Sequence, residues 1–150
     1  ALDVTIQAQI VELVRDLQKQ FGMAIIWISH NLALVAGMVE KVAVMYSGFI
    51  VEQATVDDLY ERPLHPYTLG LLNAIPSIEA GEGRPLASIE GMPPDLRKAP
   101  SGCPFAPRCP YRLEECVKTI PPLVEVGPEH TSACLRWKEL SKVKQFGEVL

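Results

Sequence analysis

The chain has 150 residues, of which 48% are hydrophobic and 21% charged, and its net charge is −4. These proportions are typical of a folded globular protein and exclude an intrinsically disordered chain. The acidic balance, without a basic stripe interleaved with aromatic residues, argues against a nucleic-acid partner. The longest apolar run, residues 23–28, is much shorter than the roughly 20 residues of a membrane-spanning helix, so none is expected.

The first quarter of the chain predicts a helix followed by a strand. Apolar residues recur at helical spacing over residues 4–21, with Asp3 as the expected N-cap and Gly22 as the expected stop. Residues 23–28 are then apolar without alternation, which favours a strand that is covered on both faces, as in a parallel α/β sheet.

Shorter elements follow. We expect a short helix over residues 32–39, two strands over 41–46 and 49–52 that form a hairpin, and helices over 55–62 and 66–74. Asn31 is the expected N-cap of the first of these helices, and Thr55 is the expected N-cap of the second. Ser47-Gly48 is the expected turn of the hairpin. Residues 76–100 are rich in glycine and proline and show little periodicity, which indicates a linker.

His30 lies between the expected strand and the next helix. In α/β sheets ligands bind at the carboxyl ends of strands, where helix N-termini offer free N–H groups to anions. A histidine at this position can donate a hydrogen bond to a phosphate or orient a water molecule. The position alone is also compatible with a purely structural hydrogen bond.

All four cysteines lie in the last third of the chain, in the order C-x5-C-x6-C-x17-C: Cys103, Cys109, Cys116 and Cys134. This segment is crowded with prolines and poor in apolar runs, so a shared metal centre would supply cohesion that a small core cannot. Free thiols, zinc and an iron–sulfur cluster are the three alternatives. Structural zinc sites usually contain short C-x2–4-C pairs, which are absent here, and the spacing itself leaves zinc and iron–sulfur open.

The other two histidines are weaker candidates for metal ligands. His65, between Leu64 and Pro66, is expected to cap the helix that follows or to pack against the hairpin. His130 lies four residues before Cys134 and would be a ligand only if the site were mixed. The chain also shows no secretory signal, which favours the cytosol, where clustered cysteines more often bind metal than form disulfides.

Several stretches together resemble a known family. Ala1-Leu2-Asp3 and Ser29-His30-Asn31-Leu32 resemble the D-loop and the switch-histidine loop of an ABC-transporter nucleotide-binding domain, with Asn31 where many members have Asp. Residues 63–68 (Pro-Leu-His-Pro-Tyr-Thr) and the cysteine spacing resemble the oligopeptide and dipeptide importer branch. The resemblance covers about residues 1–137.

This resemblance implies an α/β fold: a C-terminal fragment of a P-loop NTPase-type nucleotide-binding domain, followed by a small irregular cysteine-rich extension. It implies that ATP and Mg²⁺ act in the complete subunit, that His30 contacts the γ-phosphate, and that Asp3 lies at the interface with a second ATPase subunit. The resemblance also implies transmembrane permease subunits as the other partners. It places the complete subunit at the cytoplasmic face of the membrane. For Cys103, Cys109, Cys116 and Cys134 it favours a 4Fe–4S cluster, with zinc as the alternative.

The motifs that are missing limit the expected activity. The chain contains no G-x-x-x-x-G-K-[ST] loop, no ABC signature and no Walker B carboxylates, on which Mg²⁺-dependent phosphoryl transfer depends. We therefore expect a piece of such a subunit that does not hydrolyse ATP alone. The expected division is an ATPase part (1–76), a linker (77–101), the extension (102–137) and a tail (138–150). The alternative is a non-catalytic metal-binding or redox-sensing regulatory module.

Overall fold

The structure is a computed structural model, and it describes residues 4–75 and 88–143. The chain forms two compact units, residues 1–38 and 39–150. Within the described residues no helix is both long and apolar enough to cross a membrane. The expected cap Asp3 and residues 77–87 of the expected linker lie outside the described residues.

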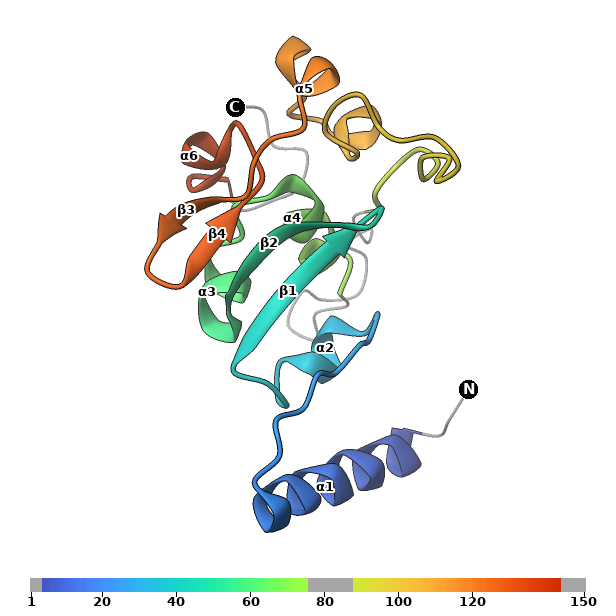
Figure 1. Cartoon of the computed structure of the whole chain (residues 1–150), viewed down its shortest axis with the longest axis vertical. Coiled ribbons are helices and arrows are strands. Elements are labelled where there is room, and N and C mark those ends of the chain that lie inside the picture. Colours follow the sequence, from blue (N-terminus) through green and yellow to red (C-terminus); the bar gives the residue numbers. More distant parts are fainter. Residues whose placement is uncertain (1–3, 76–87, 144–150) are drawn as a thin grey trace, which may run out of the picture. The chain divides into compact units, whose positions relative to one another are not determined.

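The first unit contains two helices (Figure 1). Helix α1 spans Val4–Phe21 and ends where Gly22 adopts a φ of +62°, as its sequence predicts. Helix α2 spans Leu32–Val35 and is shorter than expected. The side chain of Asn31 caps it by accepting a hydrogen bond from the Leu34 N–H at 3.2 Å, which confirms the predicted N-cap.

The strand expected over residues 23–28 is not present, and these residues have no regular structure. Ile26 and Ile28 are 92% and 94% exposed. A parallel strand requires backbone partners on its edges and cover on its faces. No described strand pairs with this segment, so its apolar side chains and backbone groups do not have the environment that the prediction assumed.

The second unit is built on a four-stranded sheet in the order β1-β2-β4-β3, in which every pairing is antiparallel (Figure 1). Strands β1 (Lys41–Tyr46) and β2 (Phe49–Thr55) form the predicted hairpin. Ser47 and Gly48 have φ values of +51° and +84°, the positive pair that a tight two-residue turn requires. The predicted hairpin is confirmed, whereas the parallel sheet expected from the apolar run at residues 23–28 is not present among the described residues.

The other two strands come from the cysteine-rich segment, which was expected to be irregular. Strand β3 (Val124–Gly127) pairs with β4 (His130–Ser132), and β4 pairs in turn with β2. Hydrogen bonds of the sheet therefore join this segment to the hairpin.

Short helices complete the unit. The predicted helices are observed as α3 (Val56–Glu61), capped by Thr55, and α4 (Pro66–Asn73), capped by His65. Three further helices lie in or after the cysteine-rich segment: η2 (Ala106–Arg108), α5 (Glu114–Lys118) and α6 (Trp137–Leu140).

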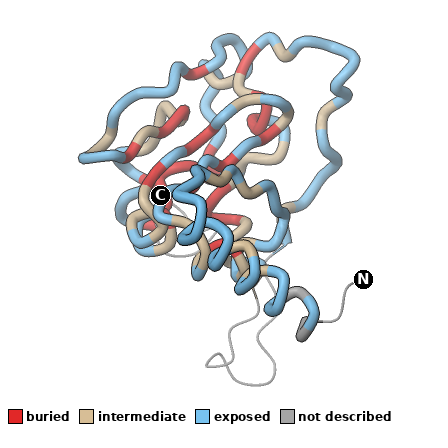
Figure 2. Tube along the Cα trace, turned by 60° about the horizontal axis from the view of Figure 1, so that its bottom comes forward, coloured by how far each residue is buried: buried red, intermediate tan, exposed pale blue. Residues whose placement is uncertain are grey.

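The core of the second unit lies between the sheet and these helices. Alternate residues of β1 are buried, as are Val51 and Ala54 of β2. Figure 2 colours the buried residues of the described chain red along its trace. Phe105 has no exposed surface and packs with its ring centroid 5.3 Å from that of Tyr46 and 5.4 Å from that of Tyr67. Aromatic contacts thus join the cysteine-rich segment to β1 and α4.

A candidate metal centre lined by four cysteines

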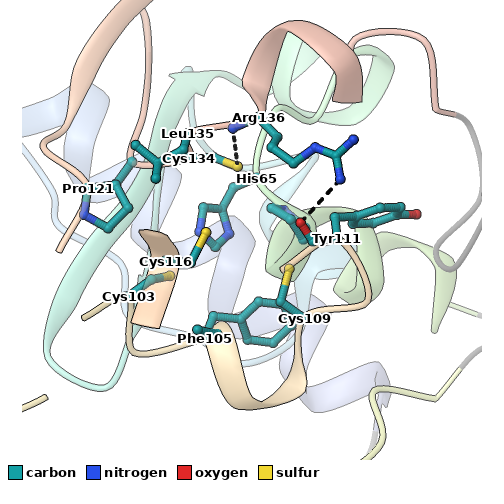
Figure 3. Close-up of a pocket in the computed structure, with 13 residues that line it drawn as sticks. His65, Cys103, Phe105, Cys109, Tyr111, Cys116, Pro121, Cys134, Leu135 and Arg136 are labelled. Carbon is teal, nitrogen blue, oxygen red and sulfur yellow. Dashed lines mark hydrogen bonds between the residues drawn. The ribbon is translucent and has the colours of Figure 1, made fainter. Parts of the chain in front are cut away.

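The four cysteines line one cavity within the second unit (Figure 3). Cys103 precedes η2 and Cys109 ends it, Cys116 lies on α5, and Cys134 follows β4. None of them forms a disulfide. Apart from the thiols the walls are mainly apolar: they include Pro66, Phe105, Ala106, Tyr111, Pro121, Ala133 and Leu135, and also His65 and Arg136. All four thiols thus line one cavity, and their role as metal ligands stays a prediction.

Backbone N–H groups point at three of the four sulfurs. The Arg136 N–H donates to Cys134 Sγ at 3.4 Å. The N–H groups of Phe105 and Tyr111 interact in the same way with the cysteines two residues before each, Cys103 and Cys109. In both of these cases a proline separates the donor from the cysteine. Such N–H···S bonds are typical of thiolates that ligate a metal, because they stabilise negative charge on sulfur.

Burial keeps these thiols in their neutral form. It raises the pKa of Cys103, and it raises the pKa of Cys109 and of Cys134 to about 12. The neighbouring thiols raise these values further, while the backbone N–H groups lower them. In an apolar cavity a thiolate is therefore favoured only when a cation shares the site, because a metal ion deprotonates its coordinating thiols.

The arrangement of two of the cysteines depends on one glycine. The Cys103 N–H donates to the Cys116 carbonyl at 2.7 Å, which brings the start of η2 against the end of α5. A Cβ atom at Gly102 would lie 2.4 Å from that same carbonyl oxygen and 2.5 Å from the Val117 carbonyl carbon. Only glycine permits this approach of the two backbones.

His65 fixes another wall of the cavity. Its Nδ1 atom accepts a hydrogen bond from the Tyr67 N–H at 3.1 Å, which confirms its predicted role as a cap of α4. The ring lies 5.9 Å, centroid to centroid, from that of Phe105 and is 2% exposed. Burial lowers the pKa of His65 to about 3, so the ring is neutral at physiological pH.

A buried carboxylate holds the surroundings of His65 in place. Glu52 on β2 has no exposed surface and accepts hydrogen bonds from the N–H groups of Leu64, at 2.5 Å, and His65, at 3.1 Å. It also accepts one from His130 Nε2 on β4 at 2.8 Å. Ser132, two residues further along β4, donates its hydroxyl to the Leu64 carbonyl at 2.9 Å. This junction joins the hairpin, the segment before α4 and the cysteine-rich segment.

The junction also shows what the sequence did not reveal. His130 is paired with Glu52 and is not among the residues that line the cavity, so the structure does not place it as a ligand. Glu52 was not singled out from the sequence, because a glutamate in the middle of a hairpin strand is usually exposed. The only available signal was its position directly after the apolar run that ends at Val51.

The chemistry of the donor set tests which metal group could fit. Four thiols in a mainly apolar cavity with N–H···S bonds are a suitable set for an iron–sulfur cluster, in which each thiolate ligates a different iron. A single zinc ion would instead need four ligands about 2.0–2.3 Å from one point. Within residues 4–75 and 88–143, no three His, Cys, Asp or Glu side chains are grouped as ligands of a single metal ion.

Of the other two predicted site residues, Asp3 and His30, the structure describes only His30. Asp3 lies outside the described residues. His30 is exposed in the bend before α2, in the first unit, where Asn31 N–H donates to Ser29 Oγ at 3.0 Å. The position of His30 just before a helix agrees with the sequence analysis, and its role as a phosphate contact stays a prediction.

Fold and site together define a small α/β protein whose cysteine-rich segment is built into its sheet. Residues 51–116 match the family described as the C-terminal region of oligopeptide/dipeptide transporters. The chain is 48% identical over 136 residues to the oligopeptide transport ATP-binding protein OppD of Escherichia coli, covering 91% of this chain and 40% of that protein. It is 46% identical over 136 residues to OppD of Salmonella typhimurium, with the same coverage.

A protein of Brucella ovis named as a peptide import ATP-binding protein is 47% identical over 146 residues, which cover 94% of this chain and 43% of that protein. The chain thus spans about two-fifths of the length of the curated relatives it matches. Over more than nine-tenths of its length the chain is therefore similar to the ATP-binding proteins of peptide transporters, and residues 51–116 match the C-terminal region of oligopeptide/dipeptide transporters.

Proposed function

We propose that this chain is part of the ATP-hydrolysing subunit that energises peptide import by an ABC transporter. The similarity to peptide-importer ATP-binding proteins over more than nine-tenths of the chain supports the proposal. ATP and Mg²⁺ would bind in the complete subunit, which would pair with a second ATPase subunit and with transmembrane permease subunits at the cytoplasmic face of the membrane. The chain has no P-loop or Walker B carboxylates, so by itself it should not turn over ATP.

In the complete subunit, His30 would hydrogen-bond the γ-phosphate and help to position the attacking water, and Asp3 would lie at the interface of the two ATPase subunits. The test is His30→Ala in a polypeptide that joins this chain to a P-loop segment. Turnover should fall by about 10²–10³-fold, the loss typical of one preorganised electrostatic contact, while ATP binding is largely kept. Unchanged turnover would reduce His30 to a structural residue.

The second part of the proposal is that Cys103, Cys109, Cys116 and Cys134 bind a 4Fe–4S cluster. The observation that carries it is the convergence of all four thiols on one mainly apolar cavity, with backbone N–H groups directed at three of the sulfurs. The cluster would hold together a segment with few large apolar side chains, because metal binding contributes directly to folding free energy.

Anaerobically purified protein should be brown and contain about four irons and four acid-labile sulfides per chain. Cys109→Ser should release the cluster and make residues 102–137 sensitive to protease. Ser101→Ala, next to the site but without a thiol, is the matched control and should keep the iron. Stoichiometric zinc without iron or sulfide would disprove the cluster and leave a four-thiolate zinc site.

A further inference from the structure

The capping role of His65 uses only one of its two ring nitrogens, Nδ1, and leaves Nε2 without an assigned role. The Tyr67 N–H occupies Nδ1, so Nδ1 is the acceptor and the neutral ring carries its proton on Nε2. Among the described residues, the ring makes no second hydrogen bond. Because the ring lines the cavity, its Nε2–H can donate a hydrogen bond to an acceptor that faces this cavity, and such a bond is favourable.

The surroundings of the ring indicate what this acceptor is. His65 lines the same cavity as all four cysteines, and Figure 3 shows its ring among the four thiols. The other side chains that line this cavity are mainly apolar, and they include Pro66 and Phe105. Apart from the Tyr111 hydroxyl, the side-chain acceptors among the lining residues that surround the ring are the thiol sulfurs.

The position of the ring is fixed from three directions. The His65 backbone N–H is bound by the Glu52 carboxylate, Nδ1 is bound by the Tyr67 N–H, and the ring packs beside Phe105. A donor held in this way needs little further ordering to form its bond, which is the property that makes such contacts effective in tuning a metal site.

We propose that His65 Nε2–H donates a hydrogen bond to a sulfur of the cluster or of one of its thiolate ligands, and so raises the reduction potential of the cluster. The inference rests on the proposed cluster and assigns His65 as a positioning and tuning residue, not as a ligand. Reduction adds negative charge to the cluster, and an N–H···S bond stabilises that charge.

Two substitutions of His65 distinguish the role of Nδ1 from the role of Nε2. His65→Asn places an amide oxygen near the position of Nδ1, so it can still cap α4 but has no donor at the position of Nε2. His65→Gln places an amide N–H near Nε2 and loses the cap. Anaerobically reconstituted His65→Asn should bind a full complement of iron with a midpoint potential that is more negative by about 59 mV, a tenfold change for one electron. His65→Gln should keep a potential near that of the unchanged protein but melt at a lower temperature.

A measurement on the unchanged full chain does not depend on how either variant folds. With ¹⁵N-labelled histidine, the reduced cluster should show hyperfine coupling to a histidine nitrogen and to its exchangeable proton. A loaded cluster without this coupling, or with equal potentials in His65→Asn and the unchanged protein, would overturn the inference and leave the cluster intact. Absence of iron and sulfide from the unchanged protein would overturn both proposals.

Discussion

The buried carboxylate of Glu52 accepts hydrogen bonds from three donors, so its replacement should destabilise the second unit. Replacing it with glutamine keeps the volume and one acceptor oxygen but turns an amide NH₂ toward a backbone or imidazole donor. At least one of the three donors from Leu64, His65 and His130 then loses its acceptor in a site with no exposed surface. Each buried donor left unsatisfied costs about 1–3 kcal/mol, so we expect a loss of about 2 kcal/mol in the free energy of unfolding.

Urea unfolding of the second unit measures this loss. In a Trp27→Phe background the fluorescence comes from Trp137, which lies in the same unit as Glu52. With a dependence of about 1–3 kcal/mol per molar urea, Glu52→Gln should lower the unfolding midpoint by about 1 M. Glu125→Gln is the matched control, because Glu125 is exposed on β3 of the same sheet, and its effect should stay within about 0.5 kcal/mol.

His130→Ala extends the test to the other side of the junction. It removes one hydrogen-bond partner of the buried Glu52 side chain, and a buried polar group left without its partner costs about 1–3 kcal/mol. In a Glu52→Gln background the same change should cost at least 0.5 kcal/mol less, because the pair is already altered. Equal midpoints for Glu52→Gln and Glu125→Gln would refute the reasoning that Glu52 joins the cysteine-rich segment to the hairpin.

Three further outcomes are expected. Gly102→Ala should destabilise the cysteine-rich segment by about 1–3 kcal/mol or more and reduce bound iron, because its Cβ would overlap a carbonyl. Gly127→Ala is the control, because its Cβ would lie 3.8 Å from the nearest atom. Equal iron contents in the two variants would contradict the argument. Burial raises the pKa of Cys109 and Cys134 from 9.0 to about 12, so the folded state of metal-free protein binds more protons than the unfolded state between these values. Its stability should therefore fall as pH rises from about 9 to 12 and be unaffected by these thiols below pH 8; a midpoint in urea that is constant up to pH 11 would disprove this. Thr55→Ala removes the side-chain cap of α3 and should cost about 1 kcal/mol in thermal or urea unfolding, whereas no change would mean that the cap is dispensable.

Local patterns in the sequence were enough to predict the elements that local interactions stabilise. Helix α1 follows from its apolar period and Gly22, and the hairpin of β1 and β2 follows from two apolar runs around Ser47-Gly48. Thr55 and Asn31 were recognised as N-caps because a hydroxyl or amide oxygen beside a helix start has a defined partner three residues away. The four cysteines of one short segment line one cavity, and the metal that they are expected to bind stays a prediction.

Tertiary structure decided everything that depends on distant partners. The apolar run at residues 23–28 is not a strand, because strand formation requires neighbours that a local pattern cannot guarantee. Strand β4 has only three residues and no recognisable period, yet its pairing with β2 joins the cysteine-rich segment to the sheet. The burial of Glu52 and the place of His65 beside the thiols come from segments that lie up to 78 residues apart, and such contacts follow only from the folded chain.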